Sequence, residues 1–187
     1  MIAVEELASA PPLPFSSVNR PARPGYVAGL QRHHLLPRSL TERACFAALF
    51  AALGPRAGLH DFRRNGLLLP ASEAGAVRMA LPLHRGPHRD YTAMAAERLG
   101  AIESEWSRRR GPFPVLAYLA ALAALDGLQA KLRRNLLDPR RSLRLNRADP
   151  LGAGADFTQL DAMAEALWGA TQPGKGAVLA ESSARAA

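Results

Sequence analysis

All five histidines of the 187-residue chain lie between residues 33 and 88. They are His33, His34, His60, His84 and His88. Imidazole both transfers protons near neutral pH and binds transition metals, so a cluster of histidines suggests a functional site. Histidines that are far apart in the sequence can share one site only if their segments meet in space. The fold is therefore expected to bring residues 31–37, 64–70 and 83–91 together around one site.

The first of these segments predicts a strand followed by a helix. Residues 26–36 are expected to form a strand that carries His33 and His34 near its end and stops at Pro37. Residues 39–42 read Ser-Leu-Thr-Glu, which has the spacing of a capping box. The apolar run that follows therefore predicts a helix through residue 53, before Gly and Pro end it.

The second and third segments predict a short strand and a long helix. Asn65-Gly66 favours a tight turn into a strand at residues 67–69. Residues 71–80 are expected to form a loop or one helical turn. Proline fits the first position of a helix because the N–H that it lacks has no partner there. Gly86-Pro87 therefore predicts the start of a helix over residues 88–109, whose apolar residues keep helical spacing.

The composition of the remaining segments predicts the domain organisation. Five prolines make residues 1–25 a flexible arm, and residues 26–110 are the expected functional core. Residues 111–150 predict a second helix, at about 115–137, and a basic loop that packs on the core. Residues 151–187 are expected to be a weakly structured tail. The predicted fold class is α+β and mostly helical.

Positive charge gathers around the histidines and on one later segment. The chain has 24 Lys and Arg against 16 Asp and Glu, a formal charge of +8. Residues 31–90 contain nine Arg against four acidic residues, and residues 111–150 contain seven basic residues against three acidic ones. This distribution suits a polyanionic partner such as nucleic acid. A solvated basic surface is the alternative.

A single cysteine, Cys45, excludes an intrachain disulfide and a cysteine-based zinc knuckle. It lies in an apolar run, which predicts a buried structural thiol. The N-terminus has no secretory signal, and the apolar run at 113–125 is too short to span a bilayer. The expected protein is soluble and has no membrane partner. It is cytoplasmic, or it is delivered by a route that leaves no visible signal peptide.

The spacing of the histidines limits what each can do. Adjacent strand residues point to opposite sides, so one of His33 and His34 can bind a metal while the other turns toward a water molecule. His84 and His88 are four residues apart and can still converge at the helix start. Three neutral imidazoles suit zinc, manganese or nickel better than magnesium alone. His60 is interpreted more simply as a surface residue.

Six further residues have two interpretations each. Asn65 is a common turn residue, and Tyr91, which follows His88 in the helix, belongs either to the core or to the site. Four arginines beside the histidines either bind phosphate or are ordinary solvated side chains. They are Arg32, Arg64, Arg85 and Arg89.

Taken in order, these residues resemble the HNH/endonuclease VII superfamily of nucleases. The residues that carry the resemblance are His33-His34-Leu35-Leu36-Pro37, Asn65-Gly66-Leu67-Leu68-Leu69-Pro70, His84-Arg85-Gly86-Pro87-His88 and Tyr91. They fall within residues 30–108. The most similar branch is the AHH family of bacterial nucleases, which are often toxin modules. Arg32 stands where that family has the alanine of its name.

The resemblance implies a ββα-metal core, also called a His-Me finger, embedded in a helical scaffold. It implies a metal-dependent endonuclease that cleaves DNA in preference to RNA. His34 would act as the general base, with Asn65 orienting it. Three histidines would hold one divalent ion, which is zinc, manganese, nickel or magnesium. They are His33, His84 and His88.

The remaining candidate residues would support this chemistry. The four arginines named above would bind nucleic acid, and His60 and Tyr91 would support the site. Two other functions fit the same residues. One is a non-catalytic nucleic-acid-binding module with a structural metal, and the other is a toxin effector nuclease that an immunity protein controls.

Overall fold

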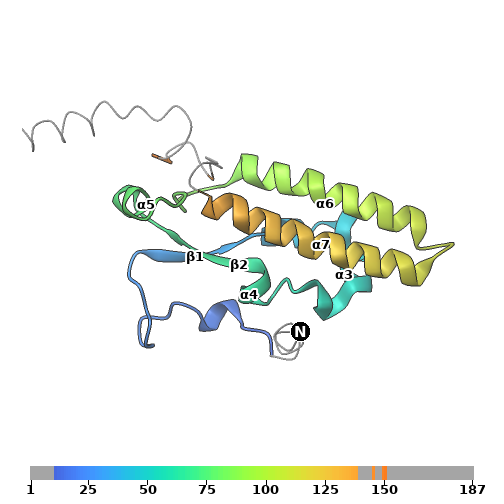
Figure 1. Cartoon of the computed structure of the whole chain (residues 1–187), viewed down its shortest axis with the longest axis horizontal. Coiled ribbons are helices and arrows are strands. Elements are labelled where there is room, and N and C mark those ends of the chain that lie inside the picture. The colour runs from blue at the N-terminus through green and yellow to red at the C-terminus, as the bar shows by residue number, and fades with distance from the viewer. Residues whose placement is uncertain (1–10, 139–144, 146–148, 151–187) are drawn as a thin grey trace, which may run out of the picture. The chain divides into compact units, whose positions relative to one another are not determined.

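A two-stranded antiparallel sheet and a pair of long helices organise the protein (Figure 1). The computed structural model describes residues 11–138, 145, 149 and 150. The elements are η1 (Phe15–Ser17), β1 (Leu30–His34), α2 (Arg38–Thr41), α3 (Ala44–Leu53), η2 (Gly54–Ala57), α4 (Phe62–Asn65), β2 (Gly66–Pro70), α5 (Glu73–Met79), α6 (Arg89–Arg109) and α7 (Pro114–Leu137). The predicted α+β, mostly helical class is confirmed.

The strand β1 is shorter than predicted. It pairs antiparallel with β2, and His33 lies opposite Leu67 while His34 lies opposite Gly66. Before the strand, the chain turns at Gly29, whose φ of +81° is in the left-handed region that glycine adopts freely. The predicted strand over residues 26–36 is therefore wrong at both ends, and only residues 30–34 form the ladder.

The predicted capping box at residues 39–42 is wrong. Pro37 is the N-cap of α2, so Ser39 lies inside that short helix. Glu42 instead pairs with Arg38 one helical turn before it. The backbone becomes extended at Arg43, and a separate helix, α3, begins at the next residue. As predicted, the apolar run ends at residue 53.

The predicted tight turn at Asn65-Gly66 is also wrong. Asn65 is the last residue of α4, whose N-cap Asp61 accepts a hydrogen bond from the Arg63 N–H at 3.0 Å. The chain then passes from α4 directly into β2. The phenyl ring of Phe62 packs against Gly66 so closely that a β-carbon at Gly66 would collide with it.

This close approach predicts that Gly66→Ala destabilises the fold. An added methyl group must displace the Phe62 ring or the strand, and such overpacking costs about 1–3 kcal/mol. Gly100→Ala in α6 is the matched control, because nothing lies within 4 Å of a β-carbon there. Replacing a helical glycine by alanine stabilises by about 0.5–1 kcal/mol. Chemical denaturation should show opposite shifts for the two variants. Equal unfolding free energies for Gly66→Ala and Gly100→Ala would mean that the Phe62 ring moves aside at no energetic cost.

The later helices agree better with prediction. Residues 73–79 form α5 where a loop or one turn was expected, and the Ser72 side chain caps it by accepting from the Gly75 N–H at 3.2 Å. His88 is the N-cap of α6, so Pro87 lies just before the helix and not at its first helical position. The end of α6 at residue 109 is as predicted. α7 differs from its prediction by one residue.

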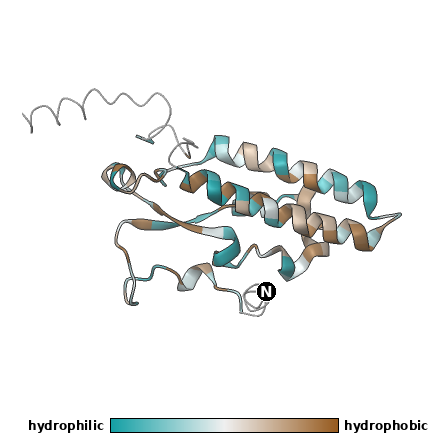
Figure 2. Cartoon of the chain, in the orientation of Figure 1, coloured by the Kyte–Doolittle hydropathy of each residue, from teal (hydrophilic) through white to brown (hydrophobic). Residues whose placement is uncertain are grey.

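The core lies where α3, α6 and α7 pack together. The antiparallel helices α6 and α7 lie side by side, and Figure 2 shows brown, apolar segments on α7 and α3. Buried residues recur along α7 at helical spacing, as in Ala117, Ala121 and Leu125. They pack with Leu99 and Trp106 of α6. This helical layer supports one side of the small sheet.

Two expectations about apolar segments differ from the structure. Cys45 is exposed, not buried, because the buried positions of α3 are Phe46, Leu49 and Leu53. α7 continues well beyond the apolar run at 113–125. Its 24 residues, with a mean hydropathy of 1.4 in the most apolar part, are long and apolar enough to cross a membrane by length and composition alone. A third of that part is buried inside the protein, and a core helix passes the same test.

The ends of the chain are described only in part. Residues 11–25, which belong to the predicted flexible arm, make hydrogen bonds to β1 and α4. Residues 1–10 lie outside the described residues. So do most of the predicted basic loop after α7 and the whole predicted tail at 151–187. Those parts of the domain organisation stay predictions.

Candidate metal centre and general base

His33 is buried in the middle of the site. Its side chain is 2% exposed, and its ring packs edge-on against Tyr91 of α6 with centroids 5.2 Å apart. Within the described residues, the Nε2 atom of His33 is buried and has no hydrogen-bond partner. An unsatisfied buried nitrogen costs about 1–3 kcal/mol, so such an atom points to a ligand.

Two hydrogen bonds of His84 and one of its neighbour Leu83 hold this part of the α5–α6 loop in place. Its backbone N–H donates to the carbonyl of Pro70 at 2.8 Å, and its ring Nδ1 lies 3.0 Å from Oε1 of Gln31. The preceding N–H, of Leu83, donates to Oδ2 of the buried Asp149 at 3.2 Å. The loop between α5 and α6 is thus attached both to the sheet and to the segment after α7.

His88 reaches the site from the N-cap position of α6. Its Nδ1 lies 3.2 Å from the backbone carbonyl of Leu145, which can only accept a hydrogen bond. The Nδ1 of His88 therefore carries the hydrogen, and its Nε2 is left as the ligand atom. The Nδ1 of His84 lies beside the side-chain amide of Gln31, so its Nε2 is the nitrogen on the side of the other two imidazoles. Acceptors of this kind orient the histidine ligands of metal sites.

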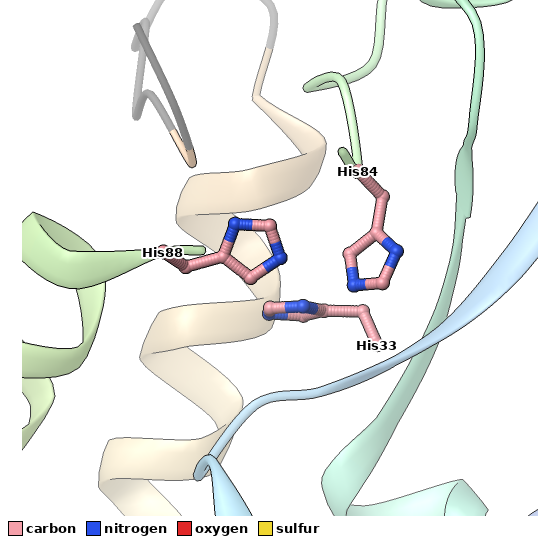
Figure 3. A group of neighbouring side chains, drawn as sticks. All are labelled: His33, His84 and His88. Carbon is pink, nitrogen blue, oxygen red and sulfur yellow. The ribbon is translucent and has the colours of Figure 1, made fainter. Parts of the chain in front are cut away.

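The three imidazoles converge from three elements (Figure 3). The ring centroid of His33 lies 5.1 Å from that of His84 and 5.5 Å from that of His88. The last two are 4.8 Å apart. One nitrogen from each residue lies within 4.8 Å of the others, so the three can bind a single metal ion. The structure thus brings together the three residues that the sequence proposes as ligands.

The electrostatics keep these rings neutral. Burial lowers the pKa of His33 well below its usual value, and His84, His88 and His34 lower it further. Burial, with His88 and His34, lowers the pKa of His84 to about 4. Burial also lowers the pKa of His88, although its hydrogen bond to Leu145 opposes that effect. Neutral imidazole is the form that binds a metal, so the three rings are ready to bind at neutral pH.

His34 lies on the opposite face of β1 from His33. Its ring stacks on the ring of Phe15, with centroids 3.8 Å apart and planes 4° apart. The pKa of His34 is lowered, first by burial and then by Arg38, His60 and Arg32. His60 is exposed, and its effect on the pKa of His34 places it near this face of β1. It is not one of the three converging imidazoles.

Asn65 fixes the chain immediately after His34. Its backbone carbonyl accepts from the Leu35 N–H at 2.8 Å. Its buried side chain accepts from the Leu36 N–H at 2.8 Å and donates to the carbonyls of Leu36 and Leu59 at 3.3 and 3.0 Å. Asn65 therefore acts on the backbone that follows His34 and not on the imidazole itself.

Tyr91 belongs both to the core and to the site. It is 1% exposed, and its hydroxyl donates to the carbonyl of Leu35 at 2.6 Å. Burial raises the pKa of its phenol, so the hydroxyl keeps its proton. Tyr91 supports the site because it packs against His33 and holds the backbone next to His34.

The four candidate arginines have different environments. Arg32 donates to the carbonyl of Phe15 at 2.9 Å, and Arg64 pairs with Asp126. Arg85 and Arg89 are exposed, and they directly follow His84 and His88 in the chain. Three further arginines, Arg63, Arg133 and Arg134, have no local sequence motif that marks them as site residues. Together with Arg64 they line a hollow of about 320 Å³ between α4 and α7.

The comparison with protein families agrees with this geometry. Residues 15–111 match the model of AHH, described as a nuclease family of the HNH/ENDO VII superfamily with conserved AHH. The chain belongs to the AHH nuclease family. The AHH match begins at Phe15 and includes both strands, the α5–α6 loop and all of α6, while α7 lies beyond it.

As a member of the AHH family, the protein is a nuclease. The chain departs from the motif that names the family, because Arg32 precedes His33-His34 where AHH has alanine. Arg32 is exposed on β1 and reaches across to the segment that contains Phe15. No curated protein and no solved structure matches the chain in these comparisons.

Proposed function

We propose that this protein is a metal-dependent endonuclease that hydrolyses phosphodiester bonds, in DNA in preference to RNA. The observation that carries the proposal is the pair of adjacent histidines on β1. His33 points into a cluster of three neutral imidazoles, and His34 lies on the other face with its pKa lowered. The proposed ligand and the proposed base are therefore neighbours on one strand.

The three converging histidines fit a divalent cation. The buried Nε2 of His33 has no partner in the described chain, and hydrogen bonds at Nδ1 leave Nε2 of His84 and His88 as ligand atoms. An all-imidazole set suits zinc, manganese or nickel better than magnesium. When bound, such an ion supplies positive charge that neutralises the phosphate and stabilises the leaving oxygen.

The chain's own residues supply the proton transfer. Neutral His34 takes a proton from the water that attacks the phosphorus, and one P–O bond forms as the bond to the leaving oxygen breaks. Asn65 and Tyr91 hold the backbone of Leu35 and Leu36, directly after His34. Because this backbone is held, the His34 ring stays in position to accept the proton from the water.

Cleavage of defined nucleic acids tests this proposal. Purified protein is incubated with supercoiled plasmid and with structured RNA, in EDTA and then with zinc, manganese, nickel or magnesium. We expect nicking and linearisation of the plasmid with at least one metal, slower cleavage of RNA and no cleavage in EDTA. Cleavage that persists in EDTA after removal of bound metal would contradict the proposed metal dependence.

The arginine hollow between α4 and α7 offers a basic surface to a nucleic-acid strand. Arg133 donates to the carbonyls of Arg63 and Arg64, at 2.6 and 3.4 Å, so it holds the hollow together. Arg63 and Arg134 are exposed. Arg63 and Arg64 belong to the same short helix as Asn65, which links this surface to the strand that carries His34.

Removing positive charge from this hollow should weaken the binding of nucleic acid without changing the rate of the chemical step. Each phosphate contact adds about 0.9 to the slope of log affinity against log salt. Arg134→Gln should lower the slope by about one. Arg63 is left unchanged in this test, because its guanidinium donates to the carbonyl of Pro11. The rate at saturating substrate should stay near that of the wild type. Fluorescence anisotropy across a salt series measures the slope.

The matched control for the hollow changes the same charge elsewhere. Arg108→Gln and Arg109→Gln lie at the C-terminal end of α6, where both arginines pair with Glu105. We expect the slope to stay unchanged in these variants. If Arg134→Gln had the same salt slope as these controls, Arg134 would make no phosphate contact.

A further inference from the structure

The segment before β1 forms a strap across α4 and β1. We use the name N-terminal strap for residues 11–18. Leu13 donates to Oδ1 of Asp61 at 3.1 Å and accepts from the Phe62 N–H at 2.7 Å. The carbonyl of Pro11 accepts from Arg63 at 2.8 Å. The strap is thus attached at its beginning to α4, the helix that ends in Asn65.

A second set of hydrogen bonds attaches the other end of the strap to β1. The guanidinium of Arg32 donates to the carbonyls of Phe15 and Val18 at 2.9 and 3.4 Å. Asn19 follows the strap and donates to the carbonyl of Leu30, the first residue of β1, at 2.9 Å. Phe15 is therefore held from both sides in the middle of the strap.

Phe15 covers one face of the His34 imidazole. The two rings are nearly parallel, with planes 4° apart and centroids 3.8 Å apart. Behind Phe15, the ring of Phe62 packs edge-on at 5.1 Å and 76°. Phe62 also packs against Gly66, which is the partner of His34 in the sheet. The strap, α4 and β2 together therefore restrict where the His34 ring can lie.

We infer that Phe15 is a positioning residue, which holds the plane of the His34 imidazole for proton transfer. The inference rests on the proposed role of His34 as the base. Rotation of a histidine ring about its second side-chain torsion has a broad energy well, so a solvated imidazole samples many orientations. A parallel aromatic ring at contact distance removes most of them. General-base catalysis depends strongly on such alignment.

The first test replaces the ring of Phe15 while keeping its bulk. Phe15→Leu should lower kcat by about tenfold, because misplacing a reacting group by about 1 Å costs up to about 100-fold in rate and the freed imidazole is only partly misaligned. KM, bound metal and affinity for DNA should stay unchanged. Phe15→Tyr keeps a ring in the same plane and should restore kcat. Phe113→Leu is the control, because Phe113 is exposed at the start of α7, and its kcat should equal that of the wild type.

A spectroscopic measurement tests the stacking without relying on activity. Protons that lie over an aromatic ring resonate upfield, so the ring C–H signals of His34 should lie upfield of those of the exposed His60. In Phe15→Leu this difference should disappear, and in Phe15→Tyr it should remain. If Phe15→Leu does not fold, the wild-type spectrum and Phe15→Tyr still decide the question. Wild-type His34 signals at the position of a solvated histidine would overturn the inference.

A double-mutant cycle separates this inference from the proposed function. If Phe15 acts through His34, adding Phe15→Leu to His34→Ala should not lower the remaining rate further. Additive losses would show that Phe15 acts elsewhere, which overturns the inference and leaves the role of His34 intact. If His34→Ala loses activity while Phe15→Leu keeps a normal kcat, the inference about Phe15 is likewise overturned and the role of His34 stands. A normal rate in His34→Ala contradicts the proposed function itself.

Discussion

His34→Ala is expected to lower the rate of phosphodiester cleavage by about two to four orders of magnitude, the usual contribution of a positioned general base. The fold should survive, because His34 is half-buried at the end of β1 and its neighbours Leu35 and Leu36 are held by Tyr91 and Asn65. Bound metal should also stay, since His34 points away from the three converging imidazoles. Initial rates on supercoiled plasmid, measured with metal content and circular dichroism, check this prediction.

The pH dependence of the wild-type rate gives an independent check on His34. Only the neutral imidazole accepts a proton, so activity should be low in acid and rise as His34 loses its proton. Burial, followed by Arg38, His60 and Arg32, lowers the pKa of His34 below 6.5. The rise should therefore be centred below pH 6.5, and His34→Ala should remove it. A His34→Ala variant that keeps its metal and cleaves at the wild-type rate would refute the assignment of His34 as the base.

His33→Ala is expected to abolish stoichiometric metal binding and, with it, cleavage. Loss of a hydrogen-bond partner outside the ligands costs about 10–100-fold in metal affinity, and loss of a ligand should cost at least as much. His84→Ala and His88→Ala should behave in the same way, because all three side chains converge. Gln31→Ala removes only the acceptor that orients His84 and should weaken binding by about tenfold.

Thermal unfolding gives a measurement of metal binding that does not depend on activity. A ligand that binds only the folded state raises its stability in proportion to the logarithm of concentration over Kd. Zinc, manganese or nickel should raise the Tm of the wild type and leave that of His33→Ala unchanged. His60→Ala is the matched control, because His60 lies outside the converging group, and it should respond like the wild type. Full metal occupancy in His33→Ala would show that the ligands have been assigned wrongly.

Short-range patterns predicted the long helices and the order of the site segments well. Helical spacing of apolar residues located α6 and α7 to within a residue or two, because that spacing reflects burial of one face. Turn and cap signals were less reliable. Ser39 lies inside α2 because that helix already begins at Arg38, after its N-cap Pro37. The hydrogen bonds of Asn65 with Leu36 and Leu59 decide its role.

Several features of the site depend on contacts that no local pattern reports. Leu145 and Asp149 follow α7, yet they bind His88 and the backbone beside His84. Phe15, from the predicted flexible arm, covers His34. Cys45 lies in an apolar run but faces outward, because the run contains more apolar residues than the core-facing side of α3 can bury.

The sequence by itself determined the family of the protein and the order of the candidate site residues along the chain. The order of His33, His34, Asn65, His84 and His88 is enough to indicate the nuclease family, and strand alternation places His33 and His34 on opposite sides. The assignment of one as ligand and the other as base is what the resemblance to that family implies. Only the tertiary structure decided how those residues are held. Hydrogen bonds and ring stacking join side chains that are tens of residues apart, and their geometry is set by the packing of whole elements.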